Sequence, residues 1–434
     1  MFRWKADSHM IEIRSRLTHW IPPAGLSRTL AIQSLVFALG AGIFMAGGTI
    51  FFNRYLGLSP VQVGLGLGVA AAISTVASLP LGTLMDRVGA KPVWLAGGVV
   101  EVLLYTLYPM VPGFAVFLGV IVLMSAAQTT TSIAVQVYSI GALPENERVR
   151  GLAYQRAALN LGMTGGGVTA GVVLAVDSSS AYLLMVWSIA AVLAIATLMV
   201  ARLPQLATTV AVSERRPLFG AIRKPSVVAT AALTGILQAN QNVLLVVLPL
   251  WTINQTDAGP PVAAALFTIN TALVVLLQVR ASAGAETAEG SARALRQSGV
   301  LAAAACAVFA TAALTTGIAT IATLVAGAIF LTMAELRQSA GAWGIVAALA
   351  PPGQRGDYVA TFKFANQLRD IVAPAGFIAL ALSTGGWGWF VIAACFVLAA
   401  LLTCPTVRWA GRVEKRTAQL ATAVGPAPEI GSTQ

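Results

Sequence analysis

The sequence contains few charged side chains. Asp, Glu, Lys and Arg make up 10% of the 434 residues, whereas soluble globular domains carry about 25%. Apolar residues make up 57% of the chain, and its mean hydropathy is +0.80. So few charges could not cover the surface of a water-soluble protein of this length. The composition therefore predicts an all-α integral membrane protein.

Histidine and cysteine are also scarce. Both histidines, His9 and His19, precede the first long apolar run, and the three cysteines, Cys306, Cys395 and Cys404, lack the spacing of metal ligands. We therefore expect no zinc site and no Ser/His/Asp or Cys/His catalytic set. The sequence also lacks G-x-x-x-x-G-K-[ST], so ATP is not expected to drive this protein directly. We expect no enzyme activity, no cofactor and no metal.

Long apolar runs fill most of the chain, and each is about long enough to cross a bilayer as a helix. They form two sets of six, which predicts two six-helix bundles at 28–202 and 225–407, a polar linker at 203–224, and tails at 1–27 and 408–434. The predicted spans are 28–52, 60–85, 92–111, 113–141, 150–176, 180–202, 225–252, 259–280, 297–316, 318–347, 357–382 and 386–407.

Basic residues gather in alternate loops. The formal net charge is +11, and the linker and the loops on its side receive most of the Lys and Arg, whereas the opposite loops receive little beyond Arg54. Because cytoplasmic loops are enriched in Lys and Arg, this bias predicts that both termini are cytoplasmic. No stripe of base-stacking aromatic residues accompanies the charge, so we do not expect nucleic acid to be a partner.

The two halves of the sequence resemble each other. Pro144 aligns with Pro351 and Arg148 with Arg355, at a common offset of 207 positions (351 − 144). The same offset places Arg156 on Lys363, Asn160 on Gln367 and Gln128 on Glu335. Such repeats are typical of transporters built from two similar bundles around a central site.

The loop between the second and third spans reads GTLMDRVGAKP. It resembles the G-x-L-x-D-R-x-G-R-K motif of the major facilitator superfamily, with Ala90 replacing the second cation. The resemblance covers all twelve spans and implies the major facilitator fold. It also implies that this loop forms a gate between the bundles on the cytoplasmic side. The predicted gate residues are Gly82, Asp86, Arg87, Gly89 and Lys91, together with Arg148 and Arg355.

Four charged residues lie inside the tenth and eleventh spans. They are Glu335, Arg337, Arg369 and Asp370. Each costs about 2.5–3.5 kcal/mol at the bilayer centre, so ionisable groups at this depth are functional by default. We expect them to neutralise one another, either as Glu335–Arg369 with Arg337–Asp370 or in the crossed arrangement, and to bind and release protons. The alternative is a static charge network that holds the two helices together.

Neutral amides accompany these charges. We predict that Gln128, Gln238, Asn242, Gln338, Gln367 and Asn366 bind substrate, because amides orient a ligand at lower insertion cost than charges. The alternative role is hydrogen bonding between helices. The first span, by contrast, offers Gly40, Phe44, Met45 and Gly47, which predicts an apolar cavity wall.

These observations favour a secondary transporter. Glu335 in the tenth span, followed by Ala350–Pro351 and Arg355–Gly356, also resembles twelve-helix drug/proton antiporters of the superfamily, although an arginine in the fourth span and G-P-x-x-G-G in the fifth are missing. We expect a monomeric plasma-membrane protein that exports amphiphilic small molecules by proton-coupled alternating access, with small molecules, protons and lipid as partners. The alternatives are a nutrient importer on the same fold and a non-transporting scaffold or lipid-handling relative.

Overall fold

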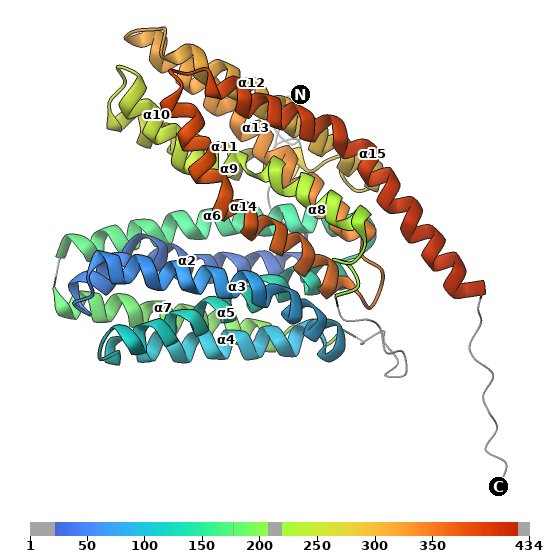
Figure 1. Cartoon of the computed structure of the whole chain (residues 1–434). Coiled ribbons are helices and arrows are strands. Elements are labelled where there is room, and N and C mark those ends of the chain that lie inside the picture. The colour runs from blue at the N-terminus through green and yellow to red at the C-terminus, as the bar shows by residue number, and fades with distance from the viewer. Residues whose placement is uncertain (1–21, 177, 207–218, 424–434) are drawn as a thin grey trace, which may run out of the picture.

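The computed structural model describes residues 22–176, 178–206 and 219–423, and helices account for nearly all of this part of the chain. Figure 1 shows two helical bundles, an N-terminal one coloured blue to green and a C-terminal one coloured yellow-green to red. The predicted all-α membrane fold of two bundles is confirmed.

The helices follow the predicted spans closely. In the N-terminal bundle they are α2 (Leu26–Arg54), α3 (Pro60–Val88), α4 (Ala90–Leu107), η1 (Tyr108–Met110), α5 (Phe114–Ala142), α6 (Glu145–Val176) and α7 (Ser179–Ala201). In the C-terminal bundle they are α8 (Pro225–Gln238), α9 (Asn240–Asn242), η2 (Val243–Val247), α10 (Leu248–Gln255), α11 (Pro260–Ala281), α12 (Ala288–Ala312), α13 (Ile318–Leu349), α14 (Arg355–Ser383) and α15 (Gly388–Ala423).

Eleven segments of the described chain are long and apolar enough to cross a membrane. The predicted span outside this set is the eleventh, α14, which is helical over 29 residues but carries Lys363, Arg369 and Asp370 in its middle. Its charges keep it outside the purely apolar class. The prediction of twelve spanning helices therefore depends on how α14 is packed, because only neighbouring helices can shield such charges from lipid.

The seventh span is broken, unlike the single helix expected for 225–252. It consists of α8, the short α9, a π-helical turn η2 and α10. The break falls on the sequence Gln238-Ala239-Asn240, where the N–H of Ala239 bonds to the carbonyl of Ile236 in place of the regular α-helical acceptor. π-Helical turns of this kind often lie at functional sites because they redirect side chains.

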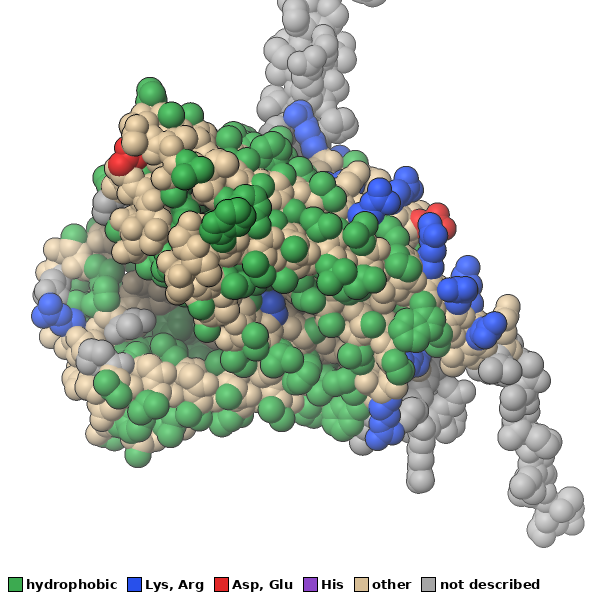
Figure 2. All heavy atoms as spheres, turned by 45° about the horizontal axis from the view of Figure 1, so that its top comes forward, with side chains coloured by type: hydrophobic (Ala, Val, Ile, Leu, Met, Phe, Trp, Pro, Cys, Tyr) green, Lys and Arg blue, Asp and Glu red, His purple; other side chains and the backbone are tan. Residues whose placement is uncertain are grey.

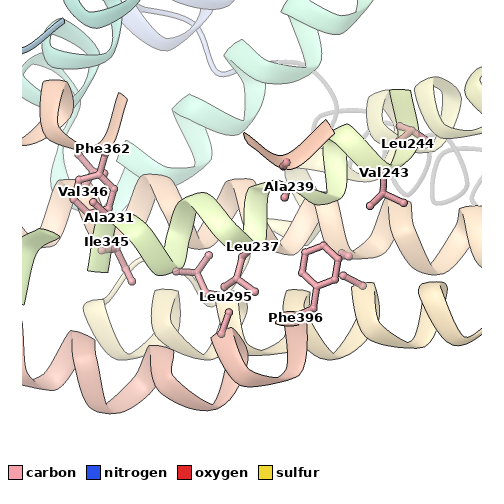
Figure 3. Packing of buried hydrophobic residues seen from close by; sticks show 14 of the residues in the cluster. Ala231, Leu237, Ala239, Val243, Leu244, Leu295, Ile345, Val346, Phe362 and Phe396 are labelled. Carbon is pink, nitrogen blue, oxygen red and sulfur yellow. The ribbon is translucent and has the colours of Figure 1, made fainter. Parts of the chain in front are cut away.

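Packing around this broken span forms the core of the C-terminal bundle. Leu237 and Val243 from the seventh span are fully buried against Leu295 of α12, Ile345 of α13 and Phe396 of α15 (Figure 3). One side of the seventh span is exposed, at Ile236 and Leu245, whereas its polar residues Thr234, Asn240 and Asn242 are buried against other helices. The interruption in the seventh span therefore lies next to the buried core of the C-terminal bundle.

The bundles meet at the end of the molecule that carries the linker, which we call the linker end. There α3 and α14 approach so closely that a Cβ atom on Gly82 would overlap the backbone of Gly356 and the side chain of Ala360. Val149 of α6 also shares a buried cluster with Ala285 and Ala340 of the C-terminal bundle. At the opposite end, the open end, the bundles diverge and the surface between them is hollowed (Figure 2).

Candidate functional site

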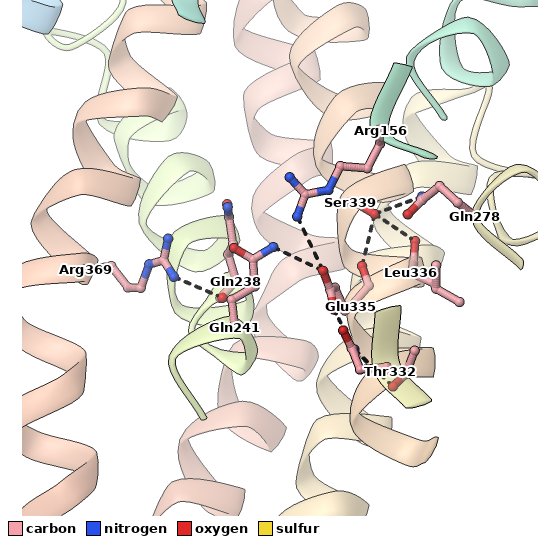
Figure 4. Close-up of polar contacts among 10 residues, drawn as sticks. Arg156, Gln238, Gln241, Gln278, Thr332, Glu335, Leu336, Ser339 and Arg369 are labelled. Atoms are coloured by element: carbon pink, nitrogen blue, oxygen red, sulfur yellow. Dashed lines mark hydrogen bonds and ion pairs between the residues drawn. The ribbon is translucent and has the colours of Figure 1, made fainter. Parts of the chain in front are cut away.

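An ion pair joins the two bundles near the middle of the molecule. Arg156 of α6 extends from the N-terminal bundle, and its Nη2 lies 3.4 Å from Oε1 of Glu335 on α13 (Figure 4). The Glu335 side chain is 10% exposed and the Arg156 side chain 28%. Coulomb attraction at such a separation is worth about 4 kcal/mol at an effective dielectric constant of about 20, before the cost of desolvation.

Two amides complete the surroundings of Glu335. Nδ2 of Asn270 on α11 donates to Oε2 of Glu335 at 3.0 Å and lies 3.1 Å from the Thr332 hydroxyl. Nε2 of Gln241 on α9 lies 3.5 Å from Oε1 (Figure 4). The carboxylate therefore receives groups from three other helices, α6, α9 and α11, which explains how a buried acid is tolerated at this depth.

A second cluster of polar residues lies between α14 and the broken seventh span. Arg369 donates to Oδ1 of Asn242 at 2.6 Å and to the backbone carbonyl of Gln238 at 3.1 Å. It also lies 3.1 Å from its neighbour Asp370, which accepts from Asn242 at 3.3 Å. The carbonyl of Gln238 is available because the helix breaks after it. Arg369 therefore binds the seventh span at the point where its regular α-helix is interrupted.

Lys363 also crosses between the bundles. Its Nζ lies 3.2 Å from the Ser132 hydroxyl on α5 of the N-terminal bundle. In the internal repeat, Lys363 corresponds to Arg156 (363 − 156 = 207), so the two halves send equivalent basic residues toward each other. This reciprocal arrangement supports the predicted repeat.

Of the ion pairs expected from the sequence, the structure forms Arg369–Asp370, which belongs to the crossed arrangement, and within the described chain it forms none of the other three. Glu335 binds Arg156, and Arg369 binds the adjacent Asp370. Arg337 lies apart from both groups and donates to the carbonyls of Ala281 and Ala283 at the linker end. The pairings expected for Glu335 were wrong because Arg156 of the other bundle binds its carboxylate, and because Arg337 points to the opposite side of α13.

The remaining predicted amides lie at different places. Gln128 donates to the Tyr105 hydroxyl inside the N-terminal bundle, so it does not reach the ion pair. Gln338 is 1% exposed, and its Nε2 has no hydrogen-bond partner among the described residues. The same holds for Oδ1 of Asn366 and Oε1 of Gln367 on α14. All three atoms are buried, so in this conformation they present no surface to a solute.

The predicted apolar cavity wall on the first span is largely wrong. Glycines 40 and 47 pack against Leu193 and Met185 of α7, and Phe44 packs edge-on against Phe52 and Tyr105 inside the N-terminal bundle. Met45 remains 68% exposed. The sequence pattern identified apolar positions correctly but could not distinguish helix packing from a cavity surface.

The motif between α3 and α4 binds the opposite bundle through Asp86. Its two carboxylate oxygens accept the backbone N–H groups of Gly356 at 2.7 Å and Asp357 at 2.9 Å, in the first turn of α14. The free N–H groups and the dipole of a helix N-terminus attract a carboxylate. Asp86 therefore caps a helix of the other bundle, and Gly82 lets the two helices approach.

The other predicted gate residues act more locally. Lys91 donates to the carbonyls of Ala201 and Leu203 within its own bundle, and Arg148 lies 3.4 Å from the carbonyl of Leu143. Gly89 joins α3 to α4 with a φ of 96°, which favours glycine. Arg87 is exposed. Arg355 of α14 lies against Gly141 of α5, so it spans the two bundles.

Arg156, Asn270, Gln241 and Lys363 belong to the site but were not predicted as site residues. Arg156 and Lys363 were visible as cations inside predicted spans, and Asn270 as a polar residue in an apolar run. Charge in a span is therefore the signal that could have found the two basic residues. Their partners come from helices that are distant in sequence, and that relationship requires the fold.

Comparison with known proteins identifies the family of the chain and solved structures with the same fold. The profile of the Major Facilitator Superfamily matches residues 30–374. A search of curated protein sequences gives no match.

Several solved structures resemble the chain. The fucose:proton symporter FucP of E. coli is 15% identical, with 88% of this chain and 98% of that chain covered and a TM-score of 0.67. A bacterial homologue of the iron transporter ferroportin, in an outward-facing state, is 12% identical, with coverage of 89% and 100% and a TM-score of 0.68. The proton:xylose symporter XylE is 14% identical, with coverage of 88% and 95% and a TM-score of 0.65.

Most of the chain matches the family profile, and its two bundles match the fold of transporters across nearly their whole length. The chain is a multi-pass membrane protein whose fold supports secondary transport. It belongs to the Major Facilitator Superfamily.

Proposed function

We propose that this protein is a proton-coupled exporter of amphiphilic small molecules that works by alternating access. The observation that carries the proposal is the ion pair between Arg156 and Glu335, which joins the two bundles. An acid that holds the bundles together links protonation to their relative motion, because its attraction to arginine depends on its charge.

The distribution of basic residues supports one orientation of the protein in the membrane. Exposed basic residues such as Arg150, Arg223 and Arg293 lie at the linker end, whereas the described loops of the open end carry Arg54 and Asp257. By the positive-inside rule we place the linker end and both termini in the cytoplasm, and we propose the plasma membrane as the location. The hollow then opens to the outside, so the structure corresponds to an outward-facing state.

Protons entering from outside would reach Glu335 through this hollow. Protonation removes the attraction to Arg156, whereas Asn270 can still form a hydrogen bond with the neutral carboxyl group. A loss of about 1.4 kcal/mol changes the ratio of two conformations tenfold, so even part of the pair's energy would shift the equilibrium. Release of the proton to the cytoplasm would restore the pair.

The cytoplasmic gate would open in the same cycle. In the outward-facing state Asp86 caps α14, and Gly82 brings α3 against that helix. Substrate cannot enter from the cytoplasm while these contacts hold. The bundles must therefore separate there, which breaks both hydrogen bonds of Asp86.

The arrangement of polar groups favours an amphiphilic substrate. Glu335, Gln338, Asn366 and Gln367 all belong to the C-terminal bundle, whereas Met45 is an exposed apolar residue of α2 in the N-terminal bundle. A solute with one hydrogen-bonding end and one apolar end matches this division. We propose that the protein acts as a monomer surrounded by lipid.

Glu335→Gln tests the proposal. Purified protein in liposomes is given a pH gradient, and the transport of lipophilic cationic dyes such as ethidium is followed together with proton movement. We expect Glu335→Gln to reduce proton-driven transport about 5–150-fold, while the protein remains folded. Glu101→Gln is the matched control because Glu101 is a buried membrane acid bonded to Thr131 in the N-terminal bundle.

The result also separates the alternatives. Proton-driven transport by Glu335→Gln at the wild-type rate would remove Glu335 from the mechanism. Uptake of a nutrient without dye export would favour an importer on the same fold. The absence of solute-dependent proton flux in the wild-type protein would favour a non-transporting scaffold or lipid-handling protein.

A further inference from the structure

The last helix extends beyond the membrane. α15 contains 36 residues, Gly388–Ala423, and is therefore about 54 Å long at 1.5 Å per residue. The hydrocarbon core is about 30 Å thick. Figure 1 shows that α15 is inclined to the helices of the N-terminal bundle and continues beyond the rest of the molecule at the linker end. Its last turns must therefore lie outside the hydrocarbon.

The exposed side of α15 changes character along its length. Leu398, Leu401 and Leu402 are 59%, 63% and 45% exposed, as expected for residues that face lipid tails. Trp409 follows at 42% exposed. Tryptophan is enriched at membrane–water interfaces, so its position indicates where α15 leaves the hydrocarbon.

Four exposed basic residues lie at this boundary or just beyond it. They are Arg408, Arg412, Lys415 and Arg416, which we call the basic stripe. At 100° per residue these positions fall within an arc of about 100°, so they form one face of the helix. Figure 2 shows Lys and Arg side chains along the edge of the molecule at the linker end. Within the described chain, no ion pair involves any of the four.

The opposite face of the same helix carries an acid that is already bound. Glu414 lies 2.8 Å from Nζ of Lys224, and the hydroxyl of Tyr358 donates to it at 2.6 Å. Lys224 precedes α8, and Tyr358 lies in the first turns of α14, next to the backbone groups that Asp86 binds. Glu414 therefore connects the extension of α15 to the end of the linker and to α14, the helix that Asp86 caps.

We propose that the basic stripe binds the phosphate headgroups of anionic lipids in the leaflet at the linker end. Arginine matches phosphate geometry with paired N–H donors, and long basic side chains reach the headgroup layer from a helix that leaves the hydrocarbon. Basic residues beside a membrane helix attract anionic lipid through the negative surface potential of the leaflet. Bound lipid would hold the extension of α15, and with it the contacts of Glu414.

The test uses the full chain in nanodiscs of phosphatidylcholine, with or without phosphatidylglycerol. The readouts are the thermal unfolding midpoint and the selectivity for spin-labelled phosphatidylglycerol. We expect phosphatidylglycerol to raise the wild-type midpoint and expect added salt to reduce this shift. The variant R408Q/R412Q/K415Q/R416Q should lose the shift and the lipid selectivity. The double variant R412Q/R416Q, which should lose part of both, replaces it if the quadruple variant does not fold.

A matched variant controls for net charge. R54Q/R150Q/R202Q/R223Q removes four exposed cations elsewhere and should keep the shift. An equal loss in this control, or an unchanged shift in the stripe variant, would overturn the proposal. An equal rise with inorganic phosphate in detergent would also overturn it, because the ligand would then be a free anion rather than a lipid.

Discussion

Arg156 and Lys363 occupy equivalent positions in the two halves of the chain, and each reaches into the opposite bundle. Their partners differ: Arg156 contacts the carboxylate of Glu335, and Lys363 contacts the hydroxyl of Ser132. The two basic residues occupy matching positions, but one contacts a charged carboxylate and the other a neutral hydroxyl. Because the carboxylate of Glu335 can gain a proton whereas the hydroxyl of Ser132 stays neutral, protonation of the partner can break only the Arg156 contact. The following predictions test this interface and the contacts at both ends of the molecule.

Removing Arg156 should weaken the closed linker end. Arg156→Ala leaves Glu335 buried without its cation, which favours a conformation in which the acid is protonated or better solvated. Spin labels at positions 150 and 293, on a background without cysteine, report the distance between the bundles at the linker end. We expect a shift toward longer distances of about tenfold or more in population ratio.

The charge-swapped variant Arg156→Glu/Glu335→Arg provides the control for this pair. If direct attraction holds the bundles, the double variant should recover part of the wild-type distance distribution, as a double-mutant cycle requires. Recovery no greater than the sum of the single effects would show that the two residues act independently.

Asp86→Asn should also favour an open linker end. An asparagine side chain offers one acceptor oxygen in place of two charged ones, so it cannot cap both Gly356 and Asp357. Hydrogen bonds to charged groups are worth about 1.5–3 kcal/mol, which corresponds to a population change of roughly tenfold or more. The same spin-label distances measure the change. Arg87→Ala, at the neighbouring exposed position, should have a smaller effect.

Gly82→Ala should impair transport for steric reasons. The added methyl group would overlap the backbone of Gly356 and the side chain of Ala360, so α3 and α14 could not approach. Transport rates in liposomes and the distances at the linker end measure the effect. Gly64→Ala is the matched control on the same helix, since a Cβ there meets nothing within 4 Å. Equal losses in both variants would mean that helix flexibility, rather than close approach, is the cause.

A pH-dependent contact is expected at the open end. The N–H of Gly317 donates to Asp257 at 2.5 Å, and this hydrogen bond lowers the pKa of the Asp257 carboxyl below its ordinary value of 3.8. Because the folded pKa is depressed, the stabilisation is present above pH 3.8 and is lost as the pH falls through the lower folded value.

Comparison with Asp257→Asn measures this contribution. The difference in unfolding midpoint between the wild type and the variant should be constant near neutral pH and should decrease under acidic conditions. A difference that does not change with pH would mean that the carboxylate charge contributes nothing to the contact between the two loops.

Much of the fold was predictable because it depends on local composition. Long apolar runs determine spanning helices, and the positions of α2 to α7 follow directly from them. The start of α12 at Ala288 was missed because its first turns are polar, and α15 continues past the predicted end at residue 407 for the same reason. Hydropathy measures burial in lipid, and it cannot detect helix that lies outside the membrane.

The sequence by itself determined that ionisable groups lie inside the predicted spans, and it predicted that the two halves are repeats. Those facts follow from residue type and spacing along one chain. Only the tertiary structure decided that Glu335 meets Arg156, that Arg337 turns to the linker end, and that Asp86 caps α14. Contacts between helices depend on how the bundles are rotated and packed, and that arrangement depends on many weak interactions that no single stretch of sequence contains.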